Sequence, residues 1–487
     1  MTPMGERINL EQAARKTMVL DVNSRYFGLE TLVLMENAGR GVADEISRKY
    51  GDQKKIGVVC GLGNNGGDGF VVARHLMSKN DLTLFLLGNS KDIRTEEARR
   101  NWHVLENTNL ERIHITDSTE LSRYDLRQFD ILVDGMLGTG TTGEPRGLYQ
   151  NAVLKINETG AKKICIDIPT GYGSKVSVQS DLTLSFHFPK CDGAQVLSLG
   201  VPLDLESRIG PGDVKVLRKR KADAHKGQAG RVMVIGGSSF FRGALEYAGN
   251  AAAKIADLVY HCSPEPCSGA IEKIPDFLGT SLQGDYLTTG HLQEIVKRVD
   301  QYRCDAVVIG PGLGLGPAIG IKEETKKLVV GLAKELKDKK IVIDADGLTA
   351  ISEDLNILRE NVVLTPHRGE FRRLSHQDPT AENVAHFAKK YGCLMVVKGP
   401  IDIVSNGTET KFNFTGNPGM ATGGTGDILS GAIAGFAASN DLFEASCAAI
   451  FVTGLAGDFV QREKGYYFTS TDVLQNLSEA INWSEDF

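Results

Sequence analysis

Apolar positions in the first fifty residues follow a helical period. They recur three and four residues apart, the spacing that brings side chains onto one face of a helix. The pattern predicts two helices, over residues 10–26 and 29–50. The apolar stripe of the second helix is formed by Leu32, Met35, Ala38, Val42 and Ile46.

From residue 56 onward the pattern changes to short, continuous apolar runs that end in glycine or polar residues. Such runs are typical of parallel strands that are buried on both faces. In the first half they predict strands at residues 56–60, 82–87, 130–134, 163–167 and 182–186. A fresh series predicts strands at residues 231–235, 306–309, 341–344, 362–365 and 394–397. The predicted fold class is therefore α/β, with one sheet in each half.

Charge density rises sharply between the two series, from Lys215 to Lys226. A solvated, charged segment of this kind is typical of a linker. The chain has 487 residues, which is more than one ordinary core holds. We expect two separable domains, residues 1–218 and residues 219–487.

The first strand of the series leads into a glycine-rich loop at residues 61–69, and a helix is predicted over residues 70–78. A glycine loop between a strand and a helix is the usual phosphate-binding unit of dinucleotide enzymes. The next strand, however, ends without the acidic residue that would hold a ribose. Since the loop also carries Asn64, Asn65 and Asp68, we interpret it as a substrate or ion site. The alternative is that these residues only shape a tight turn.

Two later strands of the first half end in aspartates, Asp134 and Asp167, and Thr170 follows the second. Because the carboxyl ends of parallel strands line one crevice, we expect these side chains near Asn65. Asn65, Asp134 and Thr170 then offer three oxygen ligands to a hard cation, and Asp167 remains free as an acid–base group. Helix capping in the following loops is the alternative for both aspartates.

In the second half, glycines and threonines crowd the segment 417–427, in front of an apolar run with helical period. Their backbone N–H groups are expected at a helix N-terminus, where they form an anion seat. No lysine follows the glycines as in a P-loop, so a nucleotide must be held another way. A carboxylate beside an anion seat repels phosphate unless it acts on the attacking atom, which makes Asp427 a candidate general base. The alternative role for Asp427 is a helix N-cap.

Every strand of the second series also ends in glycine or polar residues, as a ligand crevice requires. His367 follows the fourth strand of this series. Its two readings, a site residue and a satisfied structural histidine, are left open.

Composition narrows the class of protein. Hydrophobic residues make up 41% of the chain and charged residues 24%, which is ordinary for a soluble globular protein. The formal net charge of −6 comes without a basic face, so we expect no nucleic-acid partner. The first residues lack a signal-peptide core, and we expect no membrane span. Eight cysteines without a C-x-x-C pair predict buried thiols in a reducing cytoplasm.

Eight short motifs, in this order, resemble the bifunctional NAD(P)H-hydrate repair enzymes. The first half is similar to the family's epimerase domain through Met35-Glu36-Asn37-Ala38-Gly39, residues 63–69, residues 137–140 and residues 167–171. The second half is similar to its ribokinase-like dehydratase domain through His225-Lys226-Gly227, residues 310–314, residues 365–370 and residues 424–427. The resemblance implies a Rossmann-like α/β/α domain followed by a ribokinase-like α/β domain.

The resemblance also implies the chemistry. The first domain would interconvert the R and S forms of hydrated NADH or NADPH with K⁺ in its site, and the second would use ADP or ATP, with Mg²⁺ carried by the nucleotide, to dehydrate the S form. K⁺ would be held by Asn65, Asp134 and Thr170. The hydrate would contact Asn64, Asn65, Gly66, Gly67, Asp68, Gly138, Thr139, Gly140, Thr141, Thr142, Gly143, Glu144 and Asp167 in the first domain, and Gly314, His367 and Asp427 in the second. The nucleotide would contact Lys398, Gly399, Gly424, Thr425 and Gly426. We expect small-molecule substrates only, and a homo-oligomer.

Two segments depart from the family pattern. Thr170-Gly171 leads into Tyr172-Gly173-Ser174-Lys175, where the family usually has an aspartate-bearing turn. Asp402 stands where the lysine loop commonly has a threonine. These departures leave open how efficient epimerisation is and whether ADP or ATP is preferred.

Two other functions share part of the pattern. A ribokinase-type sugar or vitamin kinase, joined to an unrelated α/β domain, would use the same Gly-Thr-Gly-Asp segment. A nucleotide-sensing protein without turnover would need the glycine loops, but not Asp134, Asp167 and Asp427 together.

Overall fold

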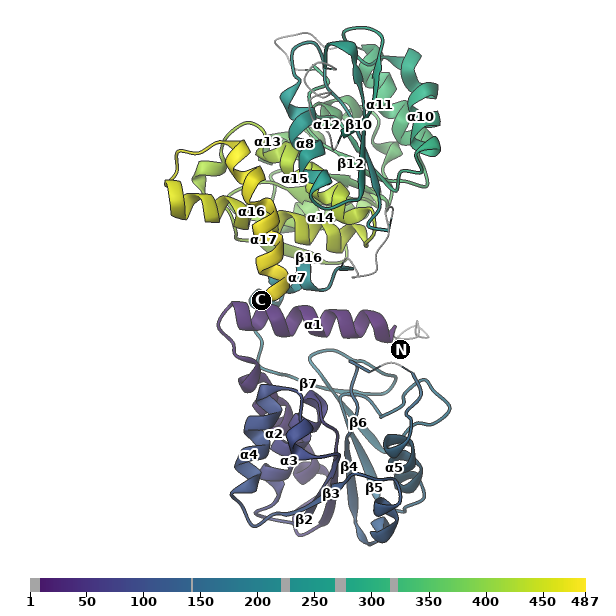
Figure 1. Cartoon of the computed structure of the whole chain (residues 1–487), viewed down its shortest axis with the longest axis vertical. Helices are drawn as coiled ribbons and strands as arrows, with labels where there is room; N and C mark the ends of the chain where they lie inside the picture. Colours follow the sequence, from purple (N-terminus) through teal and green to yellow (C-terminus); the bar gives the residue numbers. More distant parts are fainter. Residues whose placement is uncertain (1–8, 142, 220–227, 268–276, 316–322) are drawn as a thin grey trace. The chain divides into compact units, whose positions relative to one another are not determined.

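The computed structural model describes residues 9–141, 143–219, 228–267, 277–315 and 323–487 (Figure 1). The chain divides into two compact units, Met1–Glu206 and Ser207–Phe487. Each unit is built around one sheet of mostly parallel strands. The two-domain α/β architecture predicted from the sequence is confirmed.

The first unit holds a seven-stranded parallel sheet in the order β3-β2-β1-β4-β5-β6-β7. Its strands are β1 (Lys55–Cys60), β2 (Asp81–Leu87), β3 (Glu111–Ile115), β4 (Ile131–Gly135), β5 (Lys162–Ile166), β6 (Leu182–Phe186) and β7 (Gln195–Leu197). Its helices are α1 (Leu10–Tyr26), α2 (Thr31–Tyr50), α3 (Asn64–Leu76), α4 (Glu96–Glu106), α5 (Leu148–Asn157) and α6 (Leu203–Glu206). The strand order reverses between β1 and β4, and ligand crevices form at such a point.

Both faces of this sheet are covered. Figure 1 shows α2, α3 and α4 on one face and α5 on the other. Alternate residues of β1 accordingly enter different cores: Ile56 and Val58 pack with α2 and α3, whereas Val59 packs with α5. Strands buried on both faces explain the continuous apolar runs in the sequence.

The prediction of a glycine-rich loop followed by a helix from residue 70 is wrong. Helix α3 already begins at Asn64, so the glycine segment forms its first turns. The reason is close packing: a Cβ atom at Gly66 would lie 2.0 Å from the carbonyl oxygen of Gly61, and one at Gly69 would lie 2.5 Å from Sγ of Cys60. Glycine is used here for the approach of helix to strand rather than for a flexible loop.

The second unit holds a nine-stranded sheet in the order β10-β9-β8-β11-β12-β13-β14-β15-β16, parallel as far as β14 and antiparallel over the last two pairings. Its strands are β8 (Arg231–Ile235), β9 (Leu258–Pro264), β10 (Phe277–Leu282), β11 (Ala306–Ile309), β12 (Lys340–Ile343), β13 (Val362–Leu364), β14 (Leu394–Val397), β15 (Asp402–Ser405) and β16 (Thr410–Asn413). Its helices are α7 (Pro211–Lys215), α8 (Gly243–Ala253), α10 (Leu292–Gln301), α11 (Glu323–Glu335), α12 (Asp346–Ile351), α13 (Arg368–Ser375), α14 (Ala381–Tyr391), α15 (Thr425–Ala437), α16 (Leu442–Lys464) and α17 (Ser470–Asp486).

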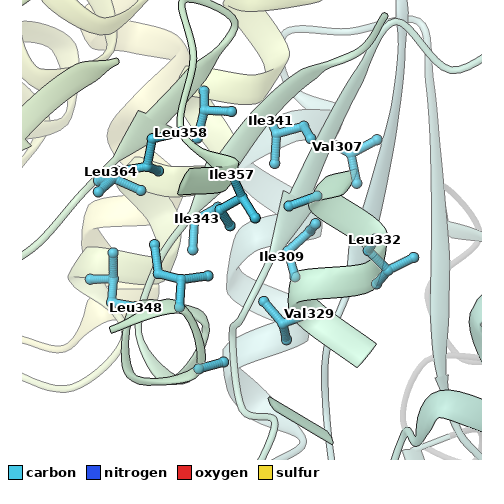
Figure 2. Packing of buried hydrophobic residues seen from close by; sticks show 14 of the residues in the cluster. Val307, Ile309, Val329, Leu332, Ile341, Ile343, Leu348, Ile357, Leu358 and Leu364 are labelled. Carbon is cyan, nitrogen blue, oxygen red and sulfur yellow. The ribbon is translucent and has the colours of Figure 1, made fainter. Parts of the chain in front are cut away.

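One face of this sheet packs on α10 to α14. Figure 2 shows side chains of β11 and β12 meeting those of α11, with Val307, Ile309, Ile341 and Ile343 against Val329 and Leu332. The other face packs on α8 and α15, and α16 lies between α15 and α17. Among the described helices, α16 alone is long and apolar enough to cross a membrane, but most of it is buried inside this unit. It is therefore a core helix of the fold.

The eight cysteines are buried and free in the described structure. Cys60 and Cys165 lie within β1 and β5, which confirms the prediction of buried thiols at these two positions. Burial in apolar surroundings raises the pKa of both thiols well above the usual value.

Residues 207–218 belong to the second unit, whereas the sequence assigned them to the first domain. Lys411 of β16 forms a buried ion pair with Asp213 of α7 at 2.6 Å. The backbone N–H of Ile209 donates to the carbonyl oxygen of Phe412 at 2.9 Å, and that of Arg218 donates to Oδ1 of Asn440 at 2.7 Å. The division by packing therefore falls before the charged segment, at Glu206/Ser207.

The packing of residues 207–218 predicts which N-terminal truncations of the second unit fold. A fragment that begins at Ser207 should fold stably, while one that begins at Lys221 loses α7, its buried Val214 and the partner of Lys411. We expect the shorter fragment to melt at a markedly lower temperature or to be insoluble. In the longer fragment, Asp213→Asn should cost about 3–5 kcal/mol, the usual effect of breaking a buried pair. Equal melting temperatures for the two fragments would contradict this assignment.

Candidate active sites

The first candidate site lies where β1, β4 and β5 end. Asp134 is the last but one residue of β4, and Thr170 follows β5. The Asp134 carboxylate accepts hydrogen bonds from the backbone N–H of Thr170 at 2.8 Å, from its hydroxyl at 2.7 Å and from the N–H of Met136 at 3.1 Å. The structure thus joins two of the three predicted ion ligands directly.

Asp134 is a buried carboxylate, 1% exposed. Burial raises its pKa, and the hydrogen bonds from Thr170 and Met136 only partly offset that effect. No salt bridge to Asp134 occurs in the part of the chain that the structure describes. A buried carboxylate that lacks a cationic partner fits a site for a metal cation.

Asn65, the third predicted ligand, is 8% exposed, and its Nδ2 atom is buried without a hydrogen-bond partner among the described residues. A Cβ atom at Gly138 would lie 3.3 Å from Oδ1 of Asn65 and 3.1 Å from Oδ2 of Asp167. Asn65 and Asp167 therefore line one small space, which the glycine keeps open. An unsatisfied buried amide at this place indicates a ligand.

Asp167 follows β5. Its backbone has a φ of 69°, in the left-handed region that residues other than glycine rarely adopt. Its carbonyl oxygen accepts from the Ser185 hydroxyl at 2.7 Å. Its carboxylate accepts from the backbone N–H and the hydroxyl of Thr139, both at 3.2 Å, and forms an ion pair with Lys190. Backbone strain of this kind persists where the surrounding structure enforces it, and it is concentrated at functional sites, where it sets the orientation of a side chain.

Lys190 is a site residue that the sequence analysis missed. It is 2% exposed, and its ammonium also lies over the rings of Phe186 and Phe188. Its position just beyond the strand over residues 182–186 was the available signal. Tyr172 supports this segment, since its hydroxyl accepts from the backbone N–H of Asp192 at 3.3 Å. Tyr172, at the departure from the family pattern, therefore contacts the segment that follows the lysine.

Two further carboxylates act on this pair. Asp68, on α3, has its pKa raised well above the usual value by burial and then by the charge of Asp167. Asp21, on α1, has its pKa raised to about 6 by burial, and Lys190 and Asp167 act on it with opposite signs. Asp21 was also missed, because nothing in the pattern of an N-terminal helix indicates which strand ends it covers.

The remaining predicted residues of this site divide into two groups. Thr139 contacts Asp167, whereas Gly140, Thr141, Gly143 and Glu144 are exposed on the loop that follows. Thr142 lies outside the described residues, as does the His225-Lys226-Gly227 motif of the second half.

The second candidate site is the N-terminus of α15. Gly424 is its N-cap, with a φ of 105° that favours glycine, and a Cβ atom there would lie 2.7 Å from the ring of Tyr247. The Ser470 hydroxyl donates to the carbonyl oxygen of Gly423 at 2.6 Å, and the Thr425 hydroxyl donates to that of Met420 at 3.1 Å. These contacts hold the segment so that the first N–H groups of the helix face outward, as an anion seat requires.

Lys398, beyond β14, extends to this helix terminus. Its ammonium forms an ion pair with Asp344 at 2.9 Å, and a Cβ atom at Gly426 would lie 3.0 Å from Nζ. Burial lowers the pKa of Lys398. The charge of Asp344, the hydrogen bond that it accepts from the ammonium, and the charges of Glu370 and Asp427 together outweigh burial, so the pKa is raised. The sequence analysis recognised Asp344 as a strand end and gave it no role.

Asp427 stands in the first turn of α15, and no hydrogen bond to its carboxylate is found among the described residues. Burial raises its pKa to about 8, the charges of Asp344 and Asp346 act in the same direction, and Lys398 acts against them. The helix-cap alternative is not what the structure shows, since the N-cap is Gly424 and no side chain caps this end. A carboxyl group with a pKa near neutrality is suited to proton transfer.

Gly314 follows β11 and His367 follows β13, two strands that are separated in the sheet by β12. The backbone N–H of Gly314 donates to Oδ2 of Asp346 at 2.8 Å. Nδ1 of His367 accepts from the backbone N–H groups of Gly369 at 3.0 Å and Glu370 at 3.2 Å, so that His367 is the N-cap of α13. Its side chain is 56% exposed. The structural role of His367 is therefore real, and a role of Nε2 toward a ligand stays a prediction.

Asp402, the second departure from the family pattern, closes the turn that follows Lys398. Its carboxylate accepts from the backbone N–H of Gly399 at 2.9 Å and from Nδ2 of Asn413 at 2.9 Å. Burial raises its pKa to about 6. It is 9% exposed and holds the lysine loop in shape.

Comparison with known proteins matches both units. The NAD(P)H-hydrate dehydratase family model matches residues 232–479, and the model described as YjeF-related protein N-terminus matches residues 31–191. A bifunctional NAD(P)H-hydrate repair enzyme of Methanocaldococcus jannaschii is 37% identical over 96% of this chain and 93% of its own length. One of Archaeoglobus fulgidus is 37% identical over 96% of this chain and 98% of its own length.

The second unit also has a solved structural relative. A ribokinase-like superfamily protein of Enterococcus faecalis matches 57% of this chain and 95% of its own chain, with 27% identity and a TM-score of 0.50. The two sheets and their strand-end sites define an α/β enzyme with a Rossmann-like and a ribokinase-like domain. The chain belongs to the family of bifunctional NAD(P)H-hydrate repair enzymes. Since the relatives span both units, the kinase fused to an unrelated domain loses its support.

The raised pKa of Asp427 makes a prediction about stability. The folded pKa of about 8 lies above the usual 3.8, so the folded state binds more protons than the unfolded state between about pH 4 and pH 8. Stability therefore falls as the pH rises through this window. Asp427→Asn removes the effect, so the variant should melt above wild type at pH 8 and close to it at about pH 4. A helix cap predicts a small loss at every pH instead, and thermal melts at several pH values distinguish the two.

Proposed function

We propose that the chain repairs hydrated nicotinamide cofactors in two steps. The first unit epimerises the R and S forms of hydrated NADH and NADPH, and the second dehydrates the S form at the expense of ADP or ATP. The observation that carries this proposal is the isolated carboxylate of Asp427 beside the N-terminus of α15, in a chain that shares both units with the repair enzymes. Small-molecule substrates, a cytoplasmic location and a homo-oligomer are part of the proposal.

Dehydration begins with a poor leaving group. The hydrate carries a hydroxyl on the carbon beside the ring nitrogen, and hydroxide does not leave at neutral pH. Asp427 takes the hydroxyl proton while the oxygen attacks the terminal phosphoryl group of the nucleotide. The N–H groups of Gly424, Thr425 and Gly426 stabilise the charge on that group. The nitrogen lone pair then expels phosphate, and a proton leaves the neighbouring ring carbon to restore the double bond.

The nucleotide is assigned to the loop that follows β14, next to the strand end that carries His367. Lys398 and Gly399 lie on one loop, and Asp402 holds that loop in shape. Gly314 and His367 lie at the strand ends assigned to the hydrate. Mg²⁺ would be carried by the nucleotide phosphates rather than by a protein cage. The preference between ADP and ATP is left to experiment.

In the first unit, Asp167 and Lys190 form the acid–base pair. Both are buried, and the strained backbone of Asp167 directs its carboxylate toward the space beside Gly138. Asn64, Gly66, Gly67 and Asp68, from the first turns of α3, would contact the hydrate together with the loop from Gly138 to Glu144. The buried Nδ2 of Asn65 is a hydrogen-bond donor without a partner among the described residues, which supports a contact with an acceptor atom of the substrate.

Asn65, Asp134 and Thr170 fit a cation of low charge density. One full negative charge, one amide and one hydroxyl form a weak-field set that suits K⁺ better than Mg²⁺. When bound, K⁺ would neutralise the charge of the buried Asp134 and would attract and position negatively charged groups of the substrate. Hydrogen bonds from the backbone N–H groups of Thr170 and Met136 hold the Asp134 carboxylate in place.

The catalytic role of Asp427 is tested by Asp427→Asn. The amide keeps the shape of the side chain but cannot accept the proton, so dehydration of the S hydrate should fall by about 10²- to 10⁴-fold. Epimerisation in the same preparation should be unchanged. The measurement is the return of the absorbance of the reduced ring in the presence of ADP or ATP. Dehydration close to the wild-type rate would rule out the assignment.

The ion site is tested by Asp134→Ala. The variant should lose epimerisation and its response to K⁺, because the only full charge among the three proposed ligands is gone. The wild type should epimerise the R hydrate faster in K⁺ than in a large organic cation at equal ionic strength. Dehydration of the S form serves as the control and should persist. If Asp134→Ala converts the R hydrate normally, the proposed ligand set is wrong.

A further inference from the structure

Asp344 is the most deeply buried charged group beside the anion seat of α15. It follows β12, is 1% exposed, and has Lys398 as its ion-pair partner at 2.9 Å. Its backbone is fixed as well, since a Cβ atom at Gly310 would lie 1.9 Å from the carbonyl oxygen of Asp344. The next residue, Ala345, has a φ of 48° in the left-handed region. The carboxylate is thus anchored from β11 and β12 together.

Without Asp344, the Lys398 ammonium could pair with other carboxylates or point into solvent. A lysine side chain is long and flexible, and a free ammonium favours solvent or the nearest carboxylate. The charges that act on it are Asp344, Glu370 and Asp427. Pairing with Asp427 would neutralise the general base, and pairing with Glu370 would draw the ammonium toward α13. In the structure Nζ instead meets Asp344 and lies against Gly426.

We propose that Asp344 is a positioning residue of the dehydration site, which holds the Lys398 ammonium at the first turn of α15, where the transferred phosphoryl group passes. This inference rests on the proposed function for the identity of the reaction. Asp344 does not touch the reacting atoms and acts through Lys398. The lysine charge then lies beside the anion seat without closing on Asp427.

The pair also bears on the titration of Asp427. The charged groups that act on Asp427 are Asp344, Lys398 and Asp346. Asp344 and Asp346 favour the protonated carboxyl, and Lys398 favours the carboxylate. Removal of the Asp344 charge therefore shifts the acidic limb of kcat/KM for dehydration to lower pH, because this limb reports the free enzyme. An ion pair that does not act on Asp427, such as Asp213 with Lys411, would not move it.

A double-mutant cycle tests the inference on the full-length protein, with Asp344→Asn, Lys398→Met and the double variant. Asp344→Asn alone should lower kcat of dehydration by about tenfold to a hundredfold, in the range of a displaced electrostatic contact. It should also weaken ADP binding, measured by calorimetry. In the Lys398→Met background the same substitution should change neither quantity, provided that kcat is compared on the alkaline plateau, where Asp427 is ionised in every variant. Equal effects in both backgrounds, or no effect of Asp344→Asn alone, would overturn the proposal.

The chain offers a matched control in Asp213. Among the described residues of this unit, it forms a second Lys–Asp pair with a buried carboxylate, with Lys411, and lies on α7. Asp213→Asn should lower Tm as Asp344→Asn does, yet leave the pH limb and ADP affinity unchanged. If Asp344→Asn fails to fold, Asp344→Glu replaces it, because the longer side chain keeps the charge and displaces the carboxylate; a loss of kcat and ADP affinity that disappears in the Lys398→Met background supports the positioning role, and no loss overturns it. ADP binding needs no turnover, so a wild type without dehydratase activity would refute the proposed function while the binding cycle still decides the positioning role.

Discussion

Both units depend on backbone approaching backbone where their central strands end. In the first, a Cβ atom at Gly61 would lie 2.1 Å from the carbonyl oxygen of Met136; in the second, one at Gly236 would lie 2.2 Å from that of Pro311. These contacts join the loops after β1 and β4, and after β8 and β11, at the points where the strand order reverses. No side chain fits there, so the strand ends converge closely enough for groups on different strands to form one site.

That convergence brings carboxylates into low-dielectric surroundings, and in both units only some of them are stabilised by an ion pair. In the first, Asp167 has Lys190, while Asp134 has only hydrogen-bond donors. In the second, Asp344 has Lys398, while Asp427 has no direct partner among the described residues. Each site therefore combines a carboxylate that a lysine neutralises with at least one that has no ion-pair partner among the described residues. The unneutralised member is costly to bury and chemically useful, the combination expected of sites selected for function rather than stability.

The sequence predicts elements better than the pairs between them. The strands at residues 182–186, 231–235, 306–309 and 394–397 have the predicted bounds, because strands buried on both faces leave uninterrupted apolar runs. The start of α3 was missed because glycine is a poor helix former, and its packing against β1 is not visible in a local pattern. The ion pair between Asp344 and Lys398 could not be predicted from the sequence for another reason. The pair joins the ends of β12 and β14, which are separated in the sheet by β13, and no local spacing encodes that order.

The packing of α7 against α16 and α17 affects the order in which the second unit can fold during synthesis. Helix α7 packs against α16 and α17, and Nζ of Lys219 donates to the carbonyl oxygen of Glu485 at 3.4 Å. The first and last segments of this unit are therefore neighbours. The partners of α7 lie far beyond it in the sequence, so the emerging second unit holds Asp213 without Lys411 until β16 has been synthesised. The first unit, whose sheet is finished by residue 197, has no such wait and can be complete while the rest is still being synthesised.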